Sequence, residues 1–245
     1  MARGLYLLFA LVAYAIFFAT FLYLIGFVGN LPGPPRTVDR GPESAVAIAL
    51  VVNVALIALF GLQHSVMARR GFKQTWTRIV PEPIERSVYV LIASLTLILL
   101  FAFWRPIPAE VWRVENVTGA AVLWALFGAG WLIVLLSTFL INHFELFGLQ
   151  QVYLHARDRA AAPPRFRTPF FYKAVRHPLY SGFFLAFWAT PVMTQGHLLL
   201  AAGVSVYMLI AIRYEERDLI HLFGEEYESY RRDVGMLAPK LGRRA

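Results

Sequence analysis

The chain has 245 residues, of which 58% are hydrophobic and only 16% are charged, and its formal net charge is +8. Soluble domains carry about 25% charged residues, so this composition excludes an ordinary soluble protein and indicates an integral membrane protein. The chain has no cysteine, which excludes disulfides, thiolate metal sites and a cysteine nucleophile. The positive charge is spread over loops between apolar runs, which suits an anionic membrane leaflet better than nucleic acid.

Four apolar runs are long enough to predict membrane-spanning helices. They are Leu5–Val28, Ser44–Met67, Ser87–Trp104 and Val117–Ile141. The first run is too long for the hydrophobic region of a typical signal peptide, so we expect it to be retained as a span.

A fifth apolar region, Leu179–Tyr214, is too long for one span and is interrupted around Gln195. We predict a tight helical hairpin there, with arms at residues 179–194 and 198–214. The charged residues 215–245 then form a cytoplasmic tail that contains a helix at the membrane surface. The expected fold is all-α: one polytopic bundle of about six helices, forming a single domain over residues 1–245.

The basic residues are distributed unevenly between the loops. Of the 23 lysines and arginines, 19 lie at the N-terminus, after the second and fourth runs, and from Arg213 onward. The alternate loops contain only Arg36, Arg40, Arg105 and Arg113. Because Lys and Arg concentrate in cytoplasmic loops, this pattern predicts that both termini lie in the cytoplasm and that the number of membrane crossings is even.

Polar side chains at the ends of these runs are candidates for function, because such groups are costly near lipid. The second run ends with Gln63-His64-Ser65, and the fourth is followed by Asn142, His143 and Glu145. The hairpin begins after Arg176-His177-Pro178 and ends at Arg213-Tyr214-Glu215-Glu216.

Each of these polar groups has an ordinary explanation when taken alone. A lone histidine near a helix end is commonly interfacial, and Asn53, on the same helix face as His64, is explained by a bond to a neighbouring helix. All four helix ends lie at the cytoplasmic level in the expected topology. Their convergence favours a single pocket near the inner interface.

The C-terminal motifs resemble those of the isoprenylcysteine carboxyl methyltransferase superfamily. The pattern R-H-P-x-Y-x-G at residues 176–182 is followed by E-E-x-x-L from Glu215 and F-G-x-x-Y-x-x-Y from Phe223. Residues 61–65, 136–152 and 186–197 are similar to a narrower family, the bacterial methanethiol S-methyltransferases. This likeness implies that S-adenosylmethionine is the methyl donor and that methanethiol, a small volatile thiol, is the acceptor. It also implies dimethyl sulfide as the product, no metal, and a place in the inner membrane of a bacterium.

The resemblance also implies where the donor binds. The residues expected at the cofactor are Arg176, His177, Pro178, Tyr180, Gly182, Tyr214, Glu215 and Glu216. The two carboxylates suit the ammonium group and the ribose hydroxyls, and the aromatic faces suit a sulfonium ion.

The acceptor side needs a base or a positive neighbour, because a thiol is a weaker nucleophile than its thiolate. His64 and His143 are the candidates, and the sequence does not rank them. Asn142 and Arg213 are expected to orient or polarise the acceptor. Gln63, Ser65 and Glu145 are expected to contact it.

Other readings remain open at this point. Related membrane enzymes methylate an isoprenylcysteine carboxylate or a lipid, and NADPH-dependent sterol reductases share a similar C-terminal signature. A haem held by His64 and His143 is a third possibility. A transporter is a fourth, although the chain shows no inverted repeats.

Overall fold

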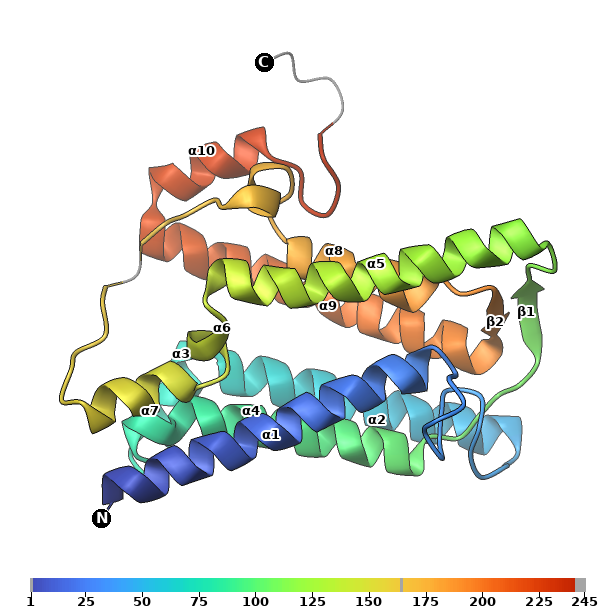
Figure 1. Cartoon of the computed structure of the whole chain (residues 1–245), viewed down its shortest axis with the longest axis horizontal. Coiled ribbons are helices and arrows are strands. Elements are labelled where there is room, and N and C mark those ends of the chain that lie inside the picture. The colour runs from blue at the N-terminus through green and yellow to red at the C-terminus, as the bar shows by residue number, and fades with distance from the viewer. Residues whose placement is uncertain (1, 164, 241–245) are drawn as a thin grey trace. The chain divides into compact units, whose positions relative to one another are not determined.

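The computed structural model describes residues 2–163 and 165–240, and most of them are helical (Figure 1). The chain divides into two compact units. The first unit comprises Met1–Arg113, Asn142–Ala162 and Val192–Gly203, and the second comprises Val114–Ile141, Pro163–Pro191 and Val204–Ala245.

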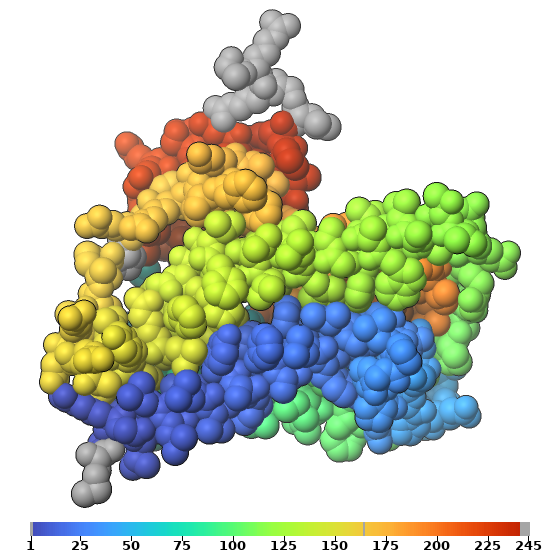
Figure 2. Space-filling view, viewed as in Figure 1, coloured from blue at the N-terminus to red at the C-terminus, as the bar shows by residue number. Residues whose placement is uncertain are grey.

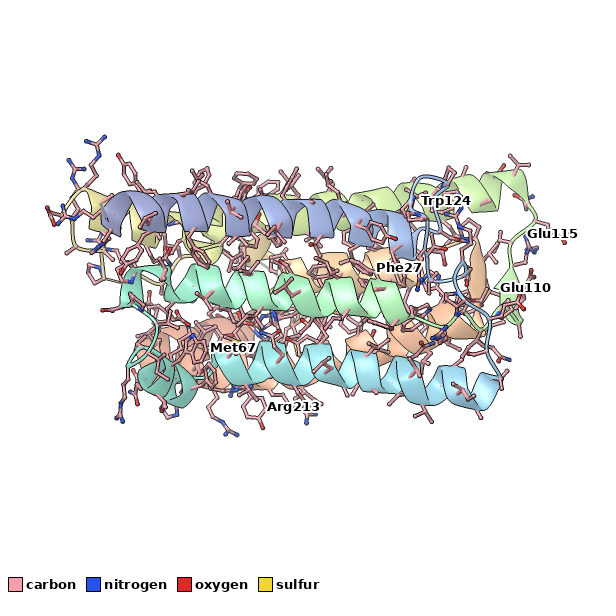
Figure 3. All side chains as sticks on the ribbon, turned by 90° about the horizontal axis from the view of Figure 1, so that it is seen from below. Phe27, Met67, Glu110, Glu115, Trp124 and Arg213 are labelled. Carbon is pink, nitrogen blue, oxygen red and sulfur yellow. The ribbon has the colours of Figure 1, made fainter. Side chains whose placement is uncertain are left out.

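Three long helices form the body of the first unit: α1 (Ala2–Val28), α2 (Val46–Ala68) and α4 (Glu82–Phe103). Helix α4 packs against both α1 and α2, and the three run side by side in both ribbon views (Figures 1 and 3). Phe27 and Met67 are buried between these helices, toward opposite ends of the unit (Figure 3).

The outer faces of these helices remain apolar. Leu8 on α1 is 59% exposed and Val51 on α2 is 71% exposed. Figure 2 shows the uncovered side of α1 in blue. Such surface is unfavourable in water and suits a lipid environment.

Five described helices are long and apolar enough to cross a membrane: α1, α2, α4, α5 (Val117–Ile141) and α9 (Gln195–Phe223). This confirms the predicted helical membrane bundle.

The shorter elements of the first unit connect these helices. They are α3 (Arg70–Trp76), α6 (His143–Leu146), α7 (Leu149–Ala156) and the strands β1 (Glu110–Arg113) and β2 (Val192–Thr194). The two strands pair antiparallel, with Glu110 opposite Thr194 and Arg113 opposite Val192. Helix α7 packs against α1 and α4.

Asn53, in the middle of α2, has a structural role. Its side chain is fully buried; it donates to the backbone oxygen of Arg105 at 2.7 Å and accepts from the backbone nitrogen of Arg105 at 2.9 Å. The explanation by a bond to a neighbouring segment is therefore correct, although the partner is the loop just after α4 rather than the helix itself.

Helix α4 begins five residues earlier than the apolar run predicts, at Glu82 instead of Ser87. Pro83 at the start and the acidic residues Glu82 and Glu85 in the first turn are typical of a helix N-terminus. As a consequence, Arg86 lies one turn inside the helix and not in the preceding loop.

In the second unit, α5 packs against α8 (Pro178–Trp188). Gly130 and Gly182 allow this close approach. A Cβ atom on Gly130 would lie 2.7 Å from the backbone oxygen of Gly182, and one on Gly182 would lie 2.7 Å from the backbone oxygen of Gly130. The unit also contains a 3-10 helix, Phe170–Lys173, and α10 (Glu225–Asp233).

The first arm of the predicted hairpin is wrong in length. Helix α8 ends at Trp188, six residues before the predicted Thr194, because Pro191 disfavours helical backbone at the residue before it and Val192–Thr194 pair with β1.

The second arm and the tail also differ from the prediction. Helix α9 begins at Gln195 rather than Leu198 and continues past Tyr214 to Phe223. Glu215 and Glu216 therefore lie inside a long helix. A break follows at Gly224, whose φ of +55° favours glycine, and α10 starts after it.

Candidate functional site

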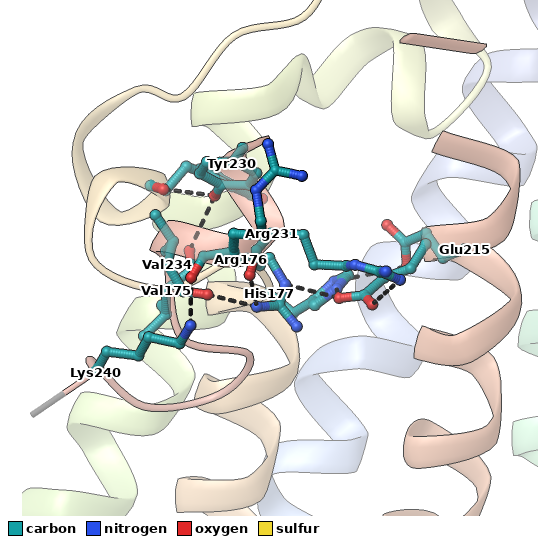
Figure 4. A network of polar contacts seen from close by, with 11 residues as sticks. Val175, Arg176, His177, Glu215, Tyr230, Arg231, Val234 and Lys240 are labelled. Carbon is teal, nitrogen blue, oxygen red and sulfur yellow. Dashed lines mark hydrogen bonds and ion pairs between the residues drawn. The ribbon is translucent and has the colours of Figure 1, made fainter. Parts of the chain in front are cut away.

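A cluster of charged side chains in the second unit joins the start of α8 to α9 (Figure 4). The Arg176 Nε donates to Glu216 Oε1 at 2.7 Å, and the His177 Nε2 lies 3.1 Å from the same oxygen. His177 and Glu216 are both buried. The structure thus brings together three of the residues that the family resemblance implies for the cofactor.

The same cluster holds the segment that follows α10. The backbone nitrogens of Arg176 and His177 donate to the oxygens of Gly235 and Met236 at 2.8 and 3.1 Å. The Arg176 side chain also donates to the backbone oxygens of Arg231, at 3.1 Å, and Val234. Arg176 is thus occupied with the protein itself and fixes the C-terminal segment beside the start of α8.

The neighbouring carboxylates Glu215 and Glu216 occupy different environments. The Glu216 side chain is 12% exposed and already paired with Arg176, whereas the Glu215 side chain is 47% exposed. Among the described residues, the one basic side chain with a nitrogen within 4.0 Å of the Glu215 carboxylate is His177, whose Nδ1 lies 4.0 Å from Glu215 Oε2. Glu215 is therefore the carboxylate with room for a positively charged ligand group.

Two tyrosines of α10 lie close to this cluster. The Tyr230 hydroxyl donates to the Tyr172 backbone oxygen at 2.5 Å, and burial raises the pKa of Tyr230 to about 12. The Tyr227 hydroxyl is buried and has no hydrogen-bond partner among the described residues. Burial raises the pKa of Tyr227, and Glu216 adds to this effect. A buried neutral hydroxyl and a half-exposed carboxylate fit a ligand that carries hydroxyl and ammonium groups.

The other four predicted cofactor residues differ in their burial and contacts. Pro178 is buried in the first turn of α8, and the Tyr180 ring lies 5.8 Å from the His177 ring. Gly182 is explained by its contact with Gly130. Tyr214 is 42% exposed, with the Arg217 guanidinium 5.7 Å from its ring centroid.

Arg213, predicted on the acceptor side, is exposed on α9 (Figure 3). No contact within the described part of the second unit supports its predicted role of orienting or polarising the acceptor, so this role stays a prediction.

In the first unit, His64 lies near the end of α2 between two aromatic rings. Its ring centroid is 5.3 Å from that of Phe60 and 5.0 Å from that of Tyr89, and the Tyr89 hydroxyl donates to the His64 backbone oxygen at 3.4 Å. The adjacent Gln63 side chain accepts from Thr96 at 3.3 Å. Ser65 is half-buried on the same helix.

His143 begins the short helix α6 and is buried. The Tyr14 hydroxyl lies 2.7 Å from its Nε2, and the Phe147 ring lies 4.8 Å from its own. Burial lowers the pKa of His143 below its usual value of 6.5, so the imidazole is neutral at pH 7. A neutral imidazole is able to accept a proton.

Asn142 and Glu145 stabilise the turn that presents His143. Asn142 caps α6: its side-chain oxygen accepts from the Glu145 backbone nitrogen at 3.3 Å, and its Nδ2 donates to Glu145 Oε2 at 2.8 Å. These contacts give Asn142 and Glu145 a structural role in the turn. Their roles toward an acceptor stay predictions.

The two histidines contact the same hydrophobic cluster of the first unit. Tyr89, beside His64, belongs to the cluster with Met67 and Val90, and Phe147, beside His143, packs against it. The sequence predicts one pocket formed by all four helix ends. Only the grouping within each unit has structural support, and the single pocket stays a prediction.

Three residues of these clusters were missed from the sequence. The position of Arg86 before an apolar run is typical of a loop residue, and only the Pro-Glu-Pro-Ile-Glu start of the helix indicates that it lies within α4. Tyr227 is part of the F-G-x-x-Y-x-x-Y motif, which by itself indicates no role for this tyrosine. Tyr14 has no local signal, because a tyrosine in an apolar helix is common.

Comparison with known proteins identifies relatives along the whole chain. A family model described as phospholipid methyltransferase matches residues 118–226. Methanethiol S-methyltransferase 1 of Bradyrhizobium diazoefficiens is 55% identical over 95% of this chain and 81% of its own length. The methanethiol S-methyltransferase of Mycobacterium tuberculosis is 51% identical over 98% of both chains. That of Crocosphaera subtropica is 48% identical over 100% of this chain and 96% of its own. No solved structure gives a significant match.

Proposed function

This chain belongs to the family of bacterial methanethiol S-methyltransferases, and from that membership we propose that it methylates methanethiol to dimethyl sulfide, with S-adenosylmethionine as donor. The observation that carries the proposal is the near-complete coverage of both chains by relatives at 48–51% identity. The charged cluster around His177 and the candidate bases His64 and His143 have the chemistry that this activity requires.

S-adenosylmethionine supplies an electrophilic methyl group, whose bond to the sulfonium sulfur breaks as the acceptor sulfur forms its new bond to carbon. The chain's contribution is to hold both partners in line and to exclude water. Glu215 is the group for the donor ammonium, because its carboxylate is half-exposed and unpaired by arginine. The buried Tyr227 hydroxyl is the group for a ribose hydroxyl. His177 and Glu216 position these groups by tying α8 to α9.

On the acceptor side, the thiol S–H bond must break before or during transfer. The proton passes to an imidazole nitrogen, and the electron pair stays on sulfur and forms the bond to the methyl group. His143 is neutral at pH 7 and suits this task, and His64 is the second candidate.

We further propose that this integral membrane protein lies in the cytoplasmic membrane with both termini in the cytoplasm. The 19 to 4 distribution of basic residues supports this orientation. Helix α8 has 11 residues, about 16 Å, too short to span about 30 Å of hydrocarbon. The following residues up to Pro191 extend it: the Pro191 oxygen accepts from the Val114 nitrogen, just before α5. Residues 178–191 thus follow α5 toward its start and supply the crossing that an even number requires.

The decisive experiment supplies purified protein with S-adenosylmethionine and methanethiol and measures headspace dimethyl sulfide. We expect product from the wild type and a loss of at least about 100-fold in kcat for His143→Ala or His64→Ala, the usual contribution of a general base. His221→Ala, an exposed histidine on α9, is the matched control. A wild type that yields no dimethyl sulfide refutes the function, and two fully active histidine variants refute the role of these bases.

A phospholipid amine and an isoprenylcysteine carboxylate are the comparison acceptors in the same assay. The family model that matches residues 118–226 is described by phospholipid methylation, so phosphatidylethanolamine is the sharper comparison. Faster methylation of either molecule than of methanethiol would reassign the acceptor while keeping the methyltransferase activity.

A further inference from the structure

Arg86 occupies an unusual position at the start of α4. Because the helix begins at Glu82, the Arg86 side chain lies beside the helices rather than in a loop, and it is half-buried. Its Nε donates to the Leu146 backbone oxygen at 2.7 Å, and its guanidinium carbon lies 4.8 Å from the centroid of the Tyr89 ring. These two contacts fix the plane of the guanidinium.

The charge of Arg86 is not neutralised by a neighbouring carboxylate. Within residues 2–163 and 165–240, no Asp or Glu oxygen lies within 4.0 Å of its nitrogens, and the outer Nη1 and Nη2 have no hydrogen-bond partner. The adjacent Glu85 is buried and interacts with Lys73. Burial lowers the pKa of Lys73, and the Arg86 charge lowers it further while Glu85 opposes. A positive field therefore extends around Arg86.

Arg86 lies between the two segments that carry the candidate bases. Its charge interacts with His64, and both residues contact Tyr89. Its Nε bonds to the last residue of α6, the helix that His143 begins. The single guanidinium is thus linked to both histidine environments within the first unit.

A structural tie alone does not explain this arrangement. The bond to Leu146 uses Nε, and stacking on Tyr89 uses the guanidinium face, so both leave the outer nitrogens unused. Keeping a half-buried cation without a counter-ion costs free energy that a neutral donor would avoid. Two unused guanidinium nitrogens are suited to charge-assisted hydrogen bonds with an anionic ligand group.

We propose that Arg86 binds the methyl acceptor as its thiolate, through Nη1 and Nη2, a catalytic role that rests on the function proposed above. The S–H bond breaks, the proton passes to an imidazole nitrogen of His143 or His64, and the negative sulfur is stabilised by the guanidinium. The aromatic rings of Tyr89, Phe60 and Phe147 offer apolar surface to the acceptor's methyl group.

The same contact favours product release. Once the sulfur has received the methyl group, dimethyl sulfide is neutral and the attraction to Arg86 is lost. The proton on the imidazole then leaves to water, which returns the base to its starting form. Arg86 thus distinguishes the anionic acceptor from the neutral product that differs by one methyl group.

The test compares pH profiles of kcat/KM for methanethiol between pH 6.5 and 9.5. A cation within a few ångströms lowers the pKa of an anionic group by about 1–3 units. For Arg86→Gln we therefore expect a decrease of at least about 10-fold at pH 7, a profile displaced by about one unit or more to higher pH, and recovery at pH 9.5. KM for S-adenosylmethionine should be unchanged. Arg78→Gln, an exposed arginine shortly before α4, is the matched control.

Arg86→Lys keeps the positive charge but loses the planar guanidinium with its two outer nitrogens. We expect it to lower kcat/KM while leaving the position of the pH profile near that of the wild type, and it decides the question if Arg86→Gln does not fold. The proposal is overturned if Arg86→Gln loses activity equally at every pH or if its pH profile of kcat/KM is not displaced. It is also overturned if the profile of Arg86→Lys is displaced by the one unit or more that is expected for Arg86→Gln. An inactive wild type would instead refute the proposed function, so the two failures are distinguishable.

Discussion

At the scale of single residues, Glu215 and Glu216 are equivalent in the sequence motif but not in the structure. We expect Glu215→Gln to raise KM for S-adenosylmethionine about 10-fold or more without changing Tm, because a half-exposed carboxylate contributes binding and little stability. We expect Glu216→Gln to lower the free energy of unfolding by about 3 kcal/mol, because it leaves the partly buried Arg176 without its carboxylate.

These two effects are separable by measuring Tm and donor affinity in detergent for each variant. Glu226→Gln, an exposed carboxylate in the first turn of α10, controls for the loss of one negative charge. A Glu215 variant that binds donor normally would contradict its assigned contact. A Glu216 variant as stable as wild type would contradict its positioning role.

The residues of the site could be predicted in part from the sequence. His64, His143 and His177 stand out because ionisable groups are rare beside apolar runs. Their partners could not be predicted: the contact of His143 with Tyr14 joins residues 129 positions apart, and nothing local in either segment encodes it. The position of Arg86 within α4 could not be predicted for a different reason: a basic residue next to an apolar run is normally a loop residue.

At the scale of elements, the contact between α5 and α8 depends on glycine. We expect Gly130→Ala to destabilise the protein by about 1–3 kcal/mol. The alanine Cβ would lie 2.7 Å from backbone atoms of α8, which move only together with the rest of that helix. Gly128→Ala on the same helix is the matched control: nothing lies within 4 Å of its Cβ, and alanine favours helix.

Thermal unfolding in detergent and hydrogen exchange in α8 measure the difference between these glycine variants. We expect faster exchange in α8 only for Gly130→Ala. Equal Tm values for the two variants would show that α5 and α8 tolerate separation.

Helix positions were predictable where one apolar run fills one span. The run Val117–Ile141 matches α5 at both ends, and Leu5–Val28 ends where α1 ends. The end of α8 was not predictable, because Val192–Thr194 adopt a strand through pairing with β1, about 80 residues earlier in the chain. Long-range pairing of this kind overrides local helix preference.

At the scale of the whole molecule, the proposed orientation places both termini in the cytoplasm. We expect reporters fused before Ala2 and after Lys240 to show cytoplasmic signals: fluorescent for a protein that folds in the cytoplasm and inactive for a phosphatase that needs the periplasm. A third fusion in the segment between α4 and α5, at Glu115, should give the opposite result. Termini on opposite sides would mean that residues 178–191 do not cross, and five spans remain.

The attachment of the C-terminal segment to Arg176 and His177 has a consequence for biosynthesis. Every membrane helix is translated before Gly235 and Met236, which complete the hydrogen bonds of the Arg176–His177 backbone. A chain that ends before Gly235 therefore still contains every described membrane helix but lacks the partners of the Arg176–His177 backbone. We expect polypeptides released early, before Val234, to insert into the membrane without the ordered Arg176–His177 cluster and therefore to lack the proposed methyltransferase activity.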